Sequence, residues 1–425
     1  MTDLTTVRHS VDSGPLDPSP PMAMPDGSDL AQSRHTDFFS IGDLLDERER
    51  AILHRVRDWC DTQVAPVAND FWERAEFPLS LVAGYGALGV AGGTLTGHGC
   101  PGLSPVAEGL VAAELARGDG SIATFNAVHS GLAMTAVGLL GSDEQQARWL
   151  PAMAAVDKLG AFALTEPDHG SDVVRLATRA RRAPGGGWIL HGSKRWIGNG
   201  TVADLVVVWA RDDDGDVGAF VVEHPDGADR PVPGYRAQKI TGKAANRAVW
   251  QAQIELDGVH VDTDARLAGA HTFEDTNTVL AKSRQTVAWE ALGHAVAAYE
   301  GAVTYALRRE QFGRPLARFQ LVQDKLAHML ADITAMQTLC VRMSQLQGEG
   351  RAQLQHAALA KLATASAARR VCADARDILG GNGILLDHHV ARHHADIEAV
   401  YTYEGTDSIQ SLIVGRAITG MSAFV

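Results

Sequence analysis

WILHGSKRWIGNG, residues 188–200, is a run of β-branched and aromatic residues that ends in a glycine-rich turn. Similar runs follow along the chain: ADLVVVWARD, GAFVVEHP and AVWQAQIELDGVHV. Turn-forming stretches such as APGGG and DDDGD separate them. Short runs of this composition between turn signals are typical of β-strands. We therefore predict an antiparallel β domain over residues 159–270.

Helical patterns lie on both sides of this block. Before it, LLDERERAILHRVRDWCDTQVAPVA places apolar residues at helical spacing, and Ser142 and Asp143 are expected to cap a helix over EQQARWLPAMAA. After it, long Ala- and Leu-rich segments run from about Thr276 and predict a helix bundle. The first residues are rich in Pro, Ser, Gly and Asp. The predicted order is a disordered tail over residues 1–37, a helical domain over 38–158, the β domain, and a C-terminal helical bundle over 271–425.

Composition excludes several classes of protein. The net charge of −13 argues against non-specific nucleic-acid binding. No uninterrupted apolar run is long enough to span a bilayer, and the N-terminal residues lack the apolar core of a secretory signal. The four cysteines are scattered without CxxC spacing, which favours neither a disulfide framework nor a zinc site. We expect a cytoplasmic protein without nucleic-acid or membrane partners.

None of three familiar site patterns supports a site in this chain. GYGALG at residues 84–89 fits a dinucleotide fingerprint, but it follows a helix-compatible stretch and leads into more glycine turn instead of opening a βαβ unit. DHHVARHH at residues 387–394 could place two histidines on one helix face, yet no HExxH pattern accompanies it. An exposed polar helix face explains those histidines equally well, and we expect no metal. GxSxG is absent, so nothing supports a hydrolase.

Three other segments have features that folding alone does not require. AFALTEPDHGSD (161–172) ends an apolar strand in a polar loop, which suits a flat hydrogen-bonding ligand, although a capped turn is the simpler interpretation. KRWIGNG (194–200) puts a tryptophan beside glycines, where it could cover an aromatic ring or lie in the core. RREQFGRPLARFQ (308–320) could clamp a pyrophosphate or form a solvated loop. Together they describe a dinucleotide-like aromatic cofactor.

The segments FALTEPDHGSD, KRWIGNG, RREQFGRPLARFQ, ILGGNGI and YTYEGT, in this order, resemble the acyl-CoA dehydrogenase family over nearly all of the chain after the tail. GRAITGMSAF further resembles the glutaryl-CoA dehydrogenase branch. RWIGNG, FEDTNTVLAKSRQTVAW and YTYEGT are similar to the short-chain acyl-CoA oxidase/dehydrogenase of plant peroxisomes. The resemblance implies the acyl-CoA dehydrogenase fold: an N-terminal α-helical domain, a middle antiparallel β domain and a C-terminal four-helix bundle.

The resemblance also implies a homotetramer that holds FAD non-covalently between the β domain and the bundle. Residues matched to flavin contacts are Phe162, Leu164, Thr165, Trp196, Ile197 and Gly198. Those matched to the FAD dinucleotide, across a subunit interface, are Arg309, Phe312, Gln320, Asp377, Ile378, Leu379, Gly380 and Gly381, with Thr406 and Ser408 by the adenosine-side phosphates. Those matched to the acyl-CoA substrate are Thr124, Ser171, Arg284, Tyr403 and Gly405.

Glu404 of YTYEGT resembles the catalytic base of the family. In the family's reaction this base removes the α-proton while FAD N5 accepts the β-hydride, which gives a trans-2-enoyl-CoA. A carboxylate in an apolar slot has a raised pKa, which suits a base near pH 7. Tyr401, Tyr403 and Gly405 supply such a slot. The resemblance also implies that a flavin ribityl hydroxyl and the Glu404 backbone N–H bind the thioester carbonyl.

Two positions depart from the family pattern. Ala123 stands where glutaryl-CoA dehydrogenases carry an arginine for the distal carboxylate, which favours an unsubstituted short or medium acyl chain. Gly198 replaces a Thr or Ser whose hydroxyl binds the flavin, and its loss could leave room for oxygen. The predicted activity is short-chain acyl-CoA dehydrogenation, with either an electron-transfer flavoprotein or O2 as the electron acceptor. The alternatives are an acyl-CoA oxidase that reduces O2, a glutaryl-CoA dehydrogenase, and a catalytically silent binding member of the fold.

Overall fold

The computed structural model describes residues 36–423, so the predicted tail over residues 1–37 lies outside the described residues except for its last two. Thr36 and Asp37 are buried. The Asp37 carboxylate accepts hydrogen bonds from the N–H groups of Ile41 (2.6 Å) and Gly42 (3.0 Å). These bonds satisfy free donors at the start of the 3₁₀ turn η1 (Ile41–Leu44), so the Asp37 side chain caps this turn.

The N-terminal domain consists of helices that mostly match the predicted pattern. They are α1 (Glu47–Trp59), a π turn (Cys60–Val64), α2 (Ala65–Arg74), η3 (Leu79–Leu81), α3 (Val82–Ala87), α4 (Pro105–Gly118), α5 (Gly120–Asn126), a π segment (Ala127–Met134), α6 (Thr135–Leu140) and α7 (Asp143–Ala154), with a small hairpin of β1 (Thr96–Gly97) and β2 (Cys100–Pro101). Ser142 caps α7 by accepting the Gln145 N–H at 3.3 Å, which confirms the predicted cap. The GYGALG motif lies in α3 and the turn after it, without a βαβ unit.

The helical stretch Gly120–Leu140, which runs from α5 through the π segment to α6, is mostly apolar and contains no Asp, Glu, Lys or Arg. Among residues 36–423 it is the one helix long and apolar enough to cross a membrane by length and composition. However, 72% of its most apolar window is buried inside the protein. A helix of this kind is equally the core helix of a packed domain, and here it packs against the sheet.

The middle domain is a seven-stranded sheet. Its strands are β3 (Gly160–Ala163), β4 (Arg179–Arg182), β5 (Trp188–Gly198), β6 (Leu205–Arg211), β7 (Val217–Glu223), β8 (Tyr235–Lys239) and β9 (Gln251–Val261), in the order β3-β6-β4-β5-β9-β8, and β7 also pairs with β6. Most strand pairs are antiparallel, as predicted, and two depart from that prediction. β3 pairs with β6 in parallel, and β4 has one parallel pair with β6. In both cases the strand is placed beside one that is not its neighbour in sequence, so no hairpin fixes the direction.

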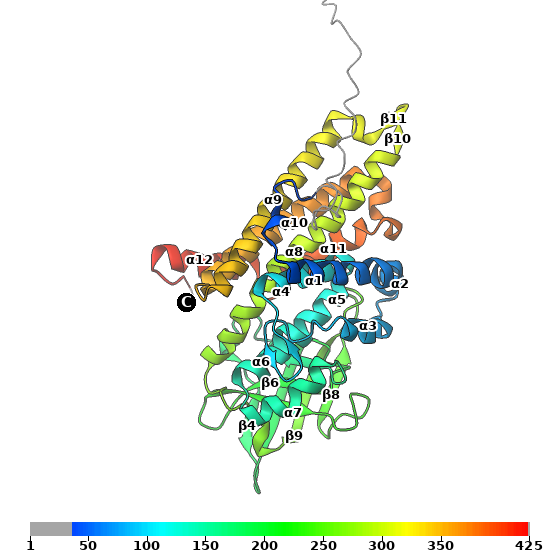
Figure 1. The fold of residues 1–425 in the computed structure, drawn as a ribbon. Coiled ribbons are helices and arrows are strands. Elements are labelled where there is room, and N and C mark those ends of the chain that lie inside the picture. Colours follow the sequence, from blue (N-terminus) through cyan, green and yellow to red (C-terminus); the bar gives the residue numbers. More distant parts are fainter. Residues whose placement is uncertain (1–35, 424–425) are drawn as a thin grey trace, which may run out of the picture.

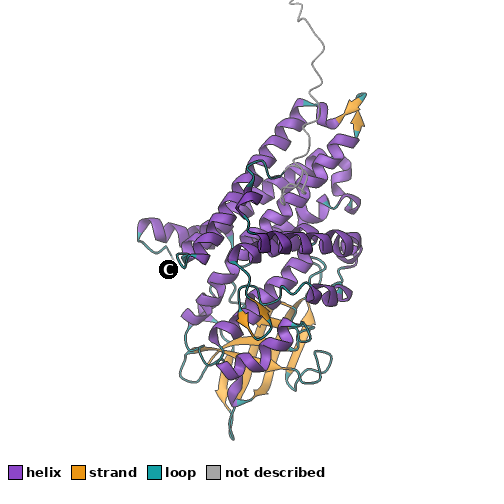
Figure 2. Cartoon of the chain, in the orientation of Figure 1, coloured by secondary structure: helices purple, strands orange, loops and turns teal. Residues whose placement is uncertain are grey.

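The C-terminal domain is built around α8 (Phe273–Arg308), which is 36 residues long. The 3₁₀ turn η6 (Thr263–Ala265) precedes it. α8 is followed by the hairpin of β10 (Glu310–Gln311) and β11 (Arg314–Pro315), then α9 (Gln320–Gly348), α10 (Leu354–Ile378), α11 (Val390–Thr402) and α12 (Asp407–Thr419), with 3₁₀ turns at η7 (Leu316–Arg318), η8 (Gly380–Ile384) and η9 (Leu386–His388). Figure 1 shows the long helices running from the sheet to the β10–β11 hairpin at the opposite end, while α12 projects sideways. Figure 2 shows the large sheet and most of the helices in separate parts of the molecule. They also occupy separate stretches of the chain, as the sequence pattern predicts.

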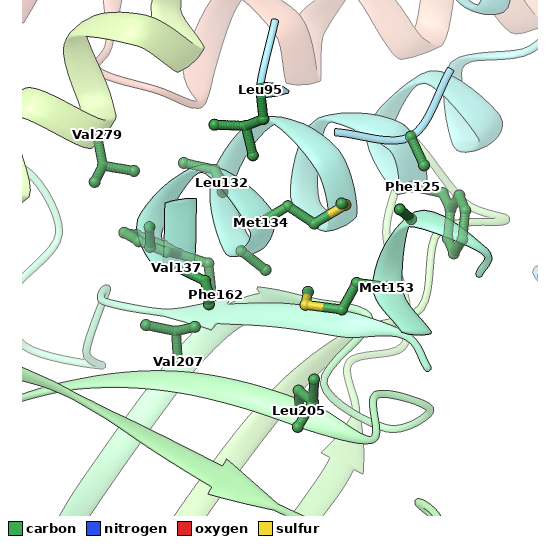
Figure 3. Close-up of a cluster of buried hydrophobic side chains, with 14 of the residues drawn as sticks. Leu95, Phe125, Leu132, Met134, Val137, Met153, Phe162, Leu205, Val207 and Val279 are labelled. Carbon is green, nitrogen blue, oxygen red and sulfur yellow. The ribbon is translucent and has the colours of Figure 1, made fainter. Parts of the chain in front are cut away.

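One apolar core joins the N-terminal helices to the sheet. Leu132, Met134 and Val137 of the Gly120–Leu140 stretch belong to the same buried cluster as Phe162 of β3 and Val207 of β6. Figure 3 shows these side chains meeting between the helix and the strands. Each fully buried side chain of this size contributes about 1.5–3 kcal/mol to folding. The contact therefore fixes how the first domain lies on the sheet.

A buried ion pair joins the N-terminal domain to α11. Arg392 Nη1 lies 2.7 Å from Asp119 Oδ2, with both side chains almost fully buried. Asp119 also caps α5, because its Oδ1 accepts the N–H of Ser121 at 2.7 Å. Arg392 thus neutralises a carboxylate that the fold must bury.

Replacing Arg392 tests this link. Arg392→Met leaves the Asp119 carboxylate buried without its cation, and we expect a loss of about 3–5 kcal/mol in the free energy of unfolding. Urea-induced unfolding followed by circular dichroism measures it. Arg370, which makes an exposed 3.0 Å ion pair with Asp332, is the matched control, and Arg370→Met should change stability by less than about 1 kcal/mol. Equal effects of the two variants would contradict the prediction.

Candidate active site

Glu404 lies in a tight turn between α11 and α12. It has a positive φ of 55°, and Gly405 has a φ of 90°. A side chain at position 405 would also collide with Gln410, whose Nε2 would lie 2.5 Å from the added Cβ. Glycine is therefore required at 405 by backbone conformation and by space, and Glu404 is held in a conformation that non-glycine residues rarely adopt.

Three buried side chains hold this turn through its carbonyl oxygens. Lys361 of α10 donates to the carbonyl oxygens of Tyr403 (2.6 Å), Tyr401 (3.3 Å) and Gly405. Gln410 Nε2 donates to the carbonyl oxygens of Glu404 (2.9 Å) and Gly405 (3.0 Å), and Arg284 Nε donates to that of Glu404 at 3.4 Å. The turn is thus rigid without participation in any sheet or helix.

The Glu404 carboxyl group has one direct hydrogen bond. Ser283 Oγ of α8 donates to Glu404 Oε2 at 2.9 Å. Burial raises the pKa of Glu404, while Arg284, the Ser283 hydroxyl and Lys361 oppose that rise. The outcome is a carboxylate that is more basic than usual and fixed in orientation, which is what a general base requires.

Tyr403 connects this turn to further buried groups. Its hydroxyl donates to Glu290 Oε2 of α8 at 2.5 Å. Thr124, expected to contact substrate, is buried on α5, where its Oγ1 accepts from Asn246 Nδ2 at 3.1 Å. Burial raises the pKa of Tyr403, and a side-chain hydrogen bond with Thr124 opposes that rise, so Thr124 lies beside Tyr403. The turn 403–405 thus lies where α5, α8 and α10 meet. Of the residues matched to substrate, Thr124, Arg284, Tyr403 and Gly405 are gathered here.

Four residues of this site carried no assigned role in the sequence analysis: Ser283, Glu290, Lys361 and Gln410. A signal was present for two of them. Glu290 is a lone acid in AWEALGHAVAA, and Lys361 is a lone base in AALAKLATASA. Charged residues that interrupt an apolar helix face are rarely buried unless they are paired or hydrogen-bonded. Ser283 and Gln410 gave no comparable signal, because polar residues are common on helices.

The residues matched to the flavin ring surround an irregular strand end. A bulge between Lys194 and Ile197 interrupts the pairing of β5 with β9, and Trp196 has a positive φ of 64°. The bulge turns the Trp196 side chain outward, where it is 50% exposed. Lys194 is fully buried; its Nζ donates to the carbonyl oxygen of Leu164 (3.0 Å) and to Glu166 (2.8 Å). This bridge fixes the loop after β3 against the tryptophan.

The other residues expected here differ in exposure. Phe162 and Leu164 belong to the apolar core, so only their backbone can meet a ligand. Thr165 is half-buried, Ile197 is buried, and Ser171 is exposed on the loop after β3. The polar loop and the outward tryptophan therefore form one surface of the β domain, beside the expected ring site.

Gly198 is closely packed, contrary to the expectation of free room for oxygen. A Cβ built on Gly198 would lie 2.6 Å from Cγ2 of Val128, which belongs to the Gly120–Leu140 stretch. The volume that a Thr or Ser side chain would need is occupied by a β-branched residue with little rotamer freedom. The glycine is thus a packing requirement in this chain.

The residues matched to the FAD dinucleotide lie elsewhere. Arg309, Phe312 and Gln320 are exposed around the β10–β11 hairpin, and Phe312 is 93% exposed. Asp377, Gly380 and Gly381 are exposed, Asp377 pairs with Lys325, and Ile378 and Leu379 are buried. Figure 1 places this end of the bundle opposite the sheet, so one chain does not bring these residues to Trp196. Thr406 caps α12 by accepting the Ile409 N–H at 3.3 Å, and Ser408 is exposed.

The sequence interpretation offered an exposed polar helix face as an explanation of the histidines in residues 387–394. The structure does not show such a face. His393 is buried, and its Nδ1 lies 2.9 Å from Nδ1 of His294. Burial is the first cause that lowers the pKa of both rings, so the pair is neutral. Within residues 36–423, no group of three or more His, Cys, Asp or Glu side chains could hold a metal ion.

Comparison with known families matches the chain in three consecutive parts. They are the acyl-CoA dehydrogenase N-terminal domain over residues 46–157, the middle domain over residues 161–259 and the C-terminal domain over residues 273–419. The chain belongs to the acyl-CoA dehydrogenase family. Membership confirms the predicted family and fold class, and it makes the chain an oxidoreductase acting on acyl-CoA, with FAD as cofactor.

Individual acyl-CoA dehydrogenases cover almost the whole chain. The mitochondrial short-chain specific acyl-CoA dehydrogenase of Bos taurus is 33% identical over 389 residues, which is 89% of this chain and 92% of that protein. A glutaryl-CoA dehydrogenase structure from Mycobacterium smegmatis has a TM-score of 0.86 and 40% identity, and covers 91% of this chain and 98% of that one. A second one, in complex with FADH2, has a TM-score of 0.87 and 35% identity, and covers 94% of this chain and all of that one (100%).

The residues present fit a flavin. Trp196 offers a half-exposed aromatic face at the end of β5, next to the polar loop that ends β3. At the far end of the bundle, a Cβ on Gly380 or Gly381 would meet no atom within 4 Å, so the backbone there is open to a ligand. An aromatic surface and an open glycine backbone suit an isoalloxazine ring and a phosphate group respectively.

The packing of Gly198 can be tested by adding one side chain. We expect Gly198→Ser to lower the free energy of unfolding by about 1–3 kcal/mol, because the new Cβ meets Val128. Val128→Ala in the same chain should recover most of that loss. Gly170, whose Cβ would meet no atom within 4 Å, is the control, and Gly170→Ser should have little effect. Thermal unfolding of the flavin-loaded protein measures all three; a fully stable Gly198→Ser variant would refute the packing argument.

Proposed function

We propose that this protein is an FAD-dependent dehydrogenase of short-chain acyl-CoA thioesters, with Glu404 as the base that removes the α-proton. The observation that carries the proposal is the half-buried, oriented Glu404 carboxyl group. Desolvation raises its pKa, and the Ser283 hydroxyl fixes its orientation at 2.9 Å. Forming a trans-2-enoyl-CoA requires a C–H proton and a hydride to leave adjacent carbons. A fixed carboxylate whose pKa is raised above its usual range meets the first requirement.

The protein's own residues position and stabilise, and the cofactor supplies the redox chemistry. When bound, FAD supplies the acceptor for the β-hydride. Glu404 takes the α-proton on its carboxylate, and its backbone N–H faces the thioester carbonyl in the proposed arrangement. The cations Arg284 and Lys361 lie around the turn. They offset the negative charge that Glu404 carries before it accepts the α-proton. Trp196 and the β3 loop would flank the ring, and Gly405 lets the substrate approach.

The proposed substrate is an unsubstituted short acyl chain. Ala123 is buried in the apolar core of α5, and it offers no cation to a distal carboxylate. An unpaired carboxylate buried at that position would be costly. The likeness to short-chain acyl-CoA dehydrogenase supports a short chain. The likeness to glutaryl-CoA dehydrogenase supports glutaryl-CoA as a second candidate, although Ala123 argues against it.

The proposed electron acceptor is an electron-transfer flavoprotein, with O2 as the alternative. The packing of Val128 against Gly198 removes the specific argument that a missing hydroxyl leaves a space for oxygen. An oxidase would reoxidise in air within the time of turnover and produce hydrogen peroxide. A dehydrogenase would need an added acceptor.

We further propose a cytoplasmic homotetramer in which the exposed residues at the far end of the bundle bind the FAD of a neighbouring chain. In one chain these residues have no aromatic or phosphate-binding partner on the β domain, since the two groups lie at opposite ends. Phe312 at 93% exposure is an unusual surface residue for an isolated chain. Association of copies would bury it.

Removing the base tests the proposed reaction. The purified, FAD-reconstituted protein is mixed anaerobically with butyryl-CoA, and the flavin absorbance is followed. We expect rapid bleaching, and in Glu404→Gln a rate lower by about 100- to 10,000-fold, because the amide cannot accept the α-proton. Glutaryl-CoA in place of butyryl-CoA should bleach the flavin far more slowly.

Admitting air then separates the two acceptors. Slow recovery of the flavin colour supports a dehydrogenase, and fast recovery with peroxide supports an oxidase. Flavin that stays oxidised with every short acyl-CoA would refute the proposed substrate. A Glu404→Gln variant that bleaches at the normal rate would refute the proposed base.

The proposed assembly makes a separate prediction. Phe312→Ala should weaken association by about 2 kcal/mol or more, as expected for an aromatic residue buried at an interface, and should lower FAD retention. Sedimentation velocity and the flavin-to-protein absorbance ratio after gel filtration measure these two effects. Phe39, a phenylalanine that is 74% exposed and has no proposed role, is the matched control. Identical behaviour of Phe312→Ala and Phe39→Ala would contradict the predicted interface.

A further inference from the structure

Glu290 is a buried acid that the proposed reaction does not use. Its side chain is 1% exposed in the apolar middle of α8. Oε2 accepts the Tyr403 hydroxyl at 2.5 Å, whereas Oε1 has no hydrogen-bond partner. In the described part of the chain, Glu290 takes part in no ion pair of its own. A buried carboxylate with one unsatisfied oxygen and no paired cation is costly, whereas a neutral carboxyl group is much less so.

The position of Glu290 relative to Glu404 follows from α8. Ser283 and Glu290 are seven residues apart, which is about two helical turns, so both lie on the same side of the helix. Ser283 binds the Glu404 carboxylate and Glu290 binds the hydroxyl of Tyr403, the residue directly before Glu404. The same face of α8 therefore holds two consecutive residues of the turn, and the two carboxyl groups belong to one buried site.

We propose that Glu290 and Glu404 form a two-carboxyl unit that holds one proton before turnover, and that Glu290 carries this proton so that Glu404 alone is ionised. The inference rests on the proposed function only for the role of Glu404 as base. The sharing of a proton is a property of the chain itself. Glu290 is thus a positioning residue, which acts through Glu404 without touching the reacting atoms.

The charges around the two carboxyl groups favour this division. Arg284 of α8 and Lys361 of α10 are the cations that favour an ionised Glu404, and Ser283 adds a hydrogen bond. Glu290 accepts a direct hydrogen bond only from the Tyr403 hydroxyl, and the positive charge of Lys361 favours its ionised form more weakly. Asp407, at the start of α12, faces Lys361. Burial is the main cause that raises the pKa of Glu290 to about 7, and the Glu404 charge raises it further. Two acids whose surroundings differ in this way ionise in separate steps.

The arrangement limits the charge of the site during the reaction. With Glu290 neutral, the site carries one carboxylate before proton transfer and none after Glu404 has taken the α-proton. If both groups were ionised, a second negative charge would remain beside the thioester and would oppose the enolate-like charge that develops there. A neutral Glu290 avoids this repulsion while Tyr403 keeps its hydrogen bond.

Infrared titration of the carboxyl C=O band tests the proposal without any turnover. The flavin-loaded wild type, Glu290→Gln and Glu404→Gln are titrated from pH 4 to 9, and difference spectra isolate each residue. We expect Glu290→Gln to lose a step near pH 7 and to keep the lower step of Glu404. In Glu404→Gln the Glu290 step should move down by about one pH unit or more, because the neighbouring negative charge is gone.

Glu108→Gln is the matched control. Glu108 of α4 is another acid whose pKa is raised by burial, and it makes no contact with the 403–405 turn, so its replacement should leave both steps unchanged. A Glu290 step that does not move in Glu404→Gln would overturn the proposal, as would a wild type and a Glu290→Gln variant with the same band near pH 7. The first of these outcomes is measured in the Glu404→Gln variant, so it can be tested even if the Glu290→Gln variant folds poorly.

The pH dependence of flavin reduction by butyryl-CoA separates positioning from mere packing. Glu290→Gln should lose the inflection near pH 7, whereas a purely structural role would lower the rate by the same factor at every pH. If the infrared steps behave as expected but the wild-type flavin never bleaches, the proposed function fails and the shared proton stands. If the flavin bleaches but the infrared steps are absent, only the shared proton fails.

Discussion

The buried ammonium group of Lys361 is the constraint on which the site depends. Its three donors meet the three carbonyl oxygens of Tyr401, Tyr403 and Gly405, which is the full hydrogen-bonding capacity of a lysine. Burial lowers the pKa of Lys361 to about 8, whereas Glu404 favours its charged form. The turn around Glu404 has no helix or strand to satisfy its backbone. The strained conformation therefore persists because one cation from α10 binds the carbonyls and also offsets the charge of the base.

The long helices make this arrangement rigid. α8 supplies Ser283 and Arg284 from one turn and Glu290 from about two turns further on, and α10 supplies Lys361 from across the bundle. A base held by packed helices keeps its orientation without the entropy loss that a mobile loop would suffer on binding substrate. The sheet serves a different purpose. Its bulge at Trp196 and the Lys194 bridge to the β3 loop create an irregular edge that a regular strand could not present.

The sequence was informative where local pattern or a family motif carries the information. Helix and strand blocks follow from period and turn residues, and the YTYEGT motif leads to Glu404 by resemblance. Other features depend on partners that are distant in sequence. The parallel pairing of β3 with β6 is set by the placement of both strands, the burial of His393 by His294, and the need for Gly198 by Val128. No local pattern contains these pairs. Lone charges in apolar helices were the one usable signal, and it pointed to Lys361.

The groups around Glu404 and the residues expected to bind the FAD dinucleotide differ in how far they are buried. The difference has a physical reason. The groups that hold the Glu404 turn, Ser283, Arg284, Lys361 and Gln410, make their contacts to it within one chain, so the fold itself orders them. Arg309, Phe312 and the stretch 377–381 lie at the opposite end, where much of the surface is exposed and apolar. Exposed aromatic and glycine-rich surface of this sort gains stability only when something covers it. In the reaction and assembly that we propose, proton removal uses groups of a single chain, whereas the dinucleotide is also held by a second copy. Loss of that assembly would release cofactor while Glu404 and its hydrogen bonds stay in place.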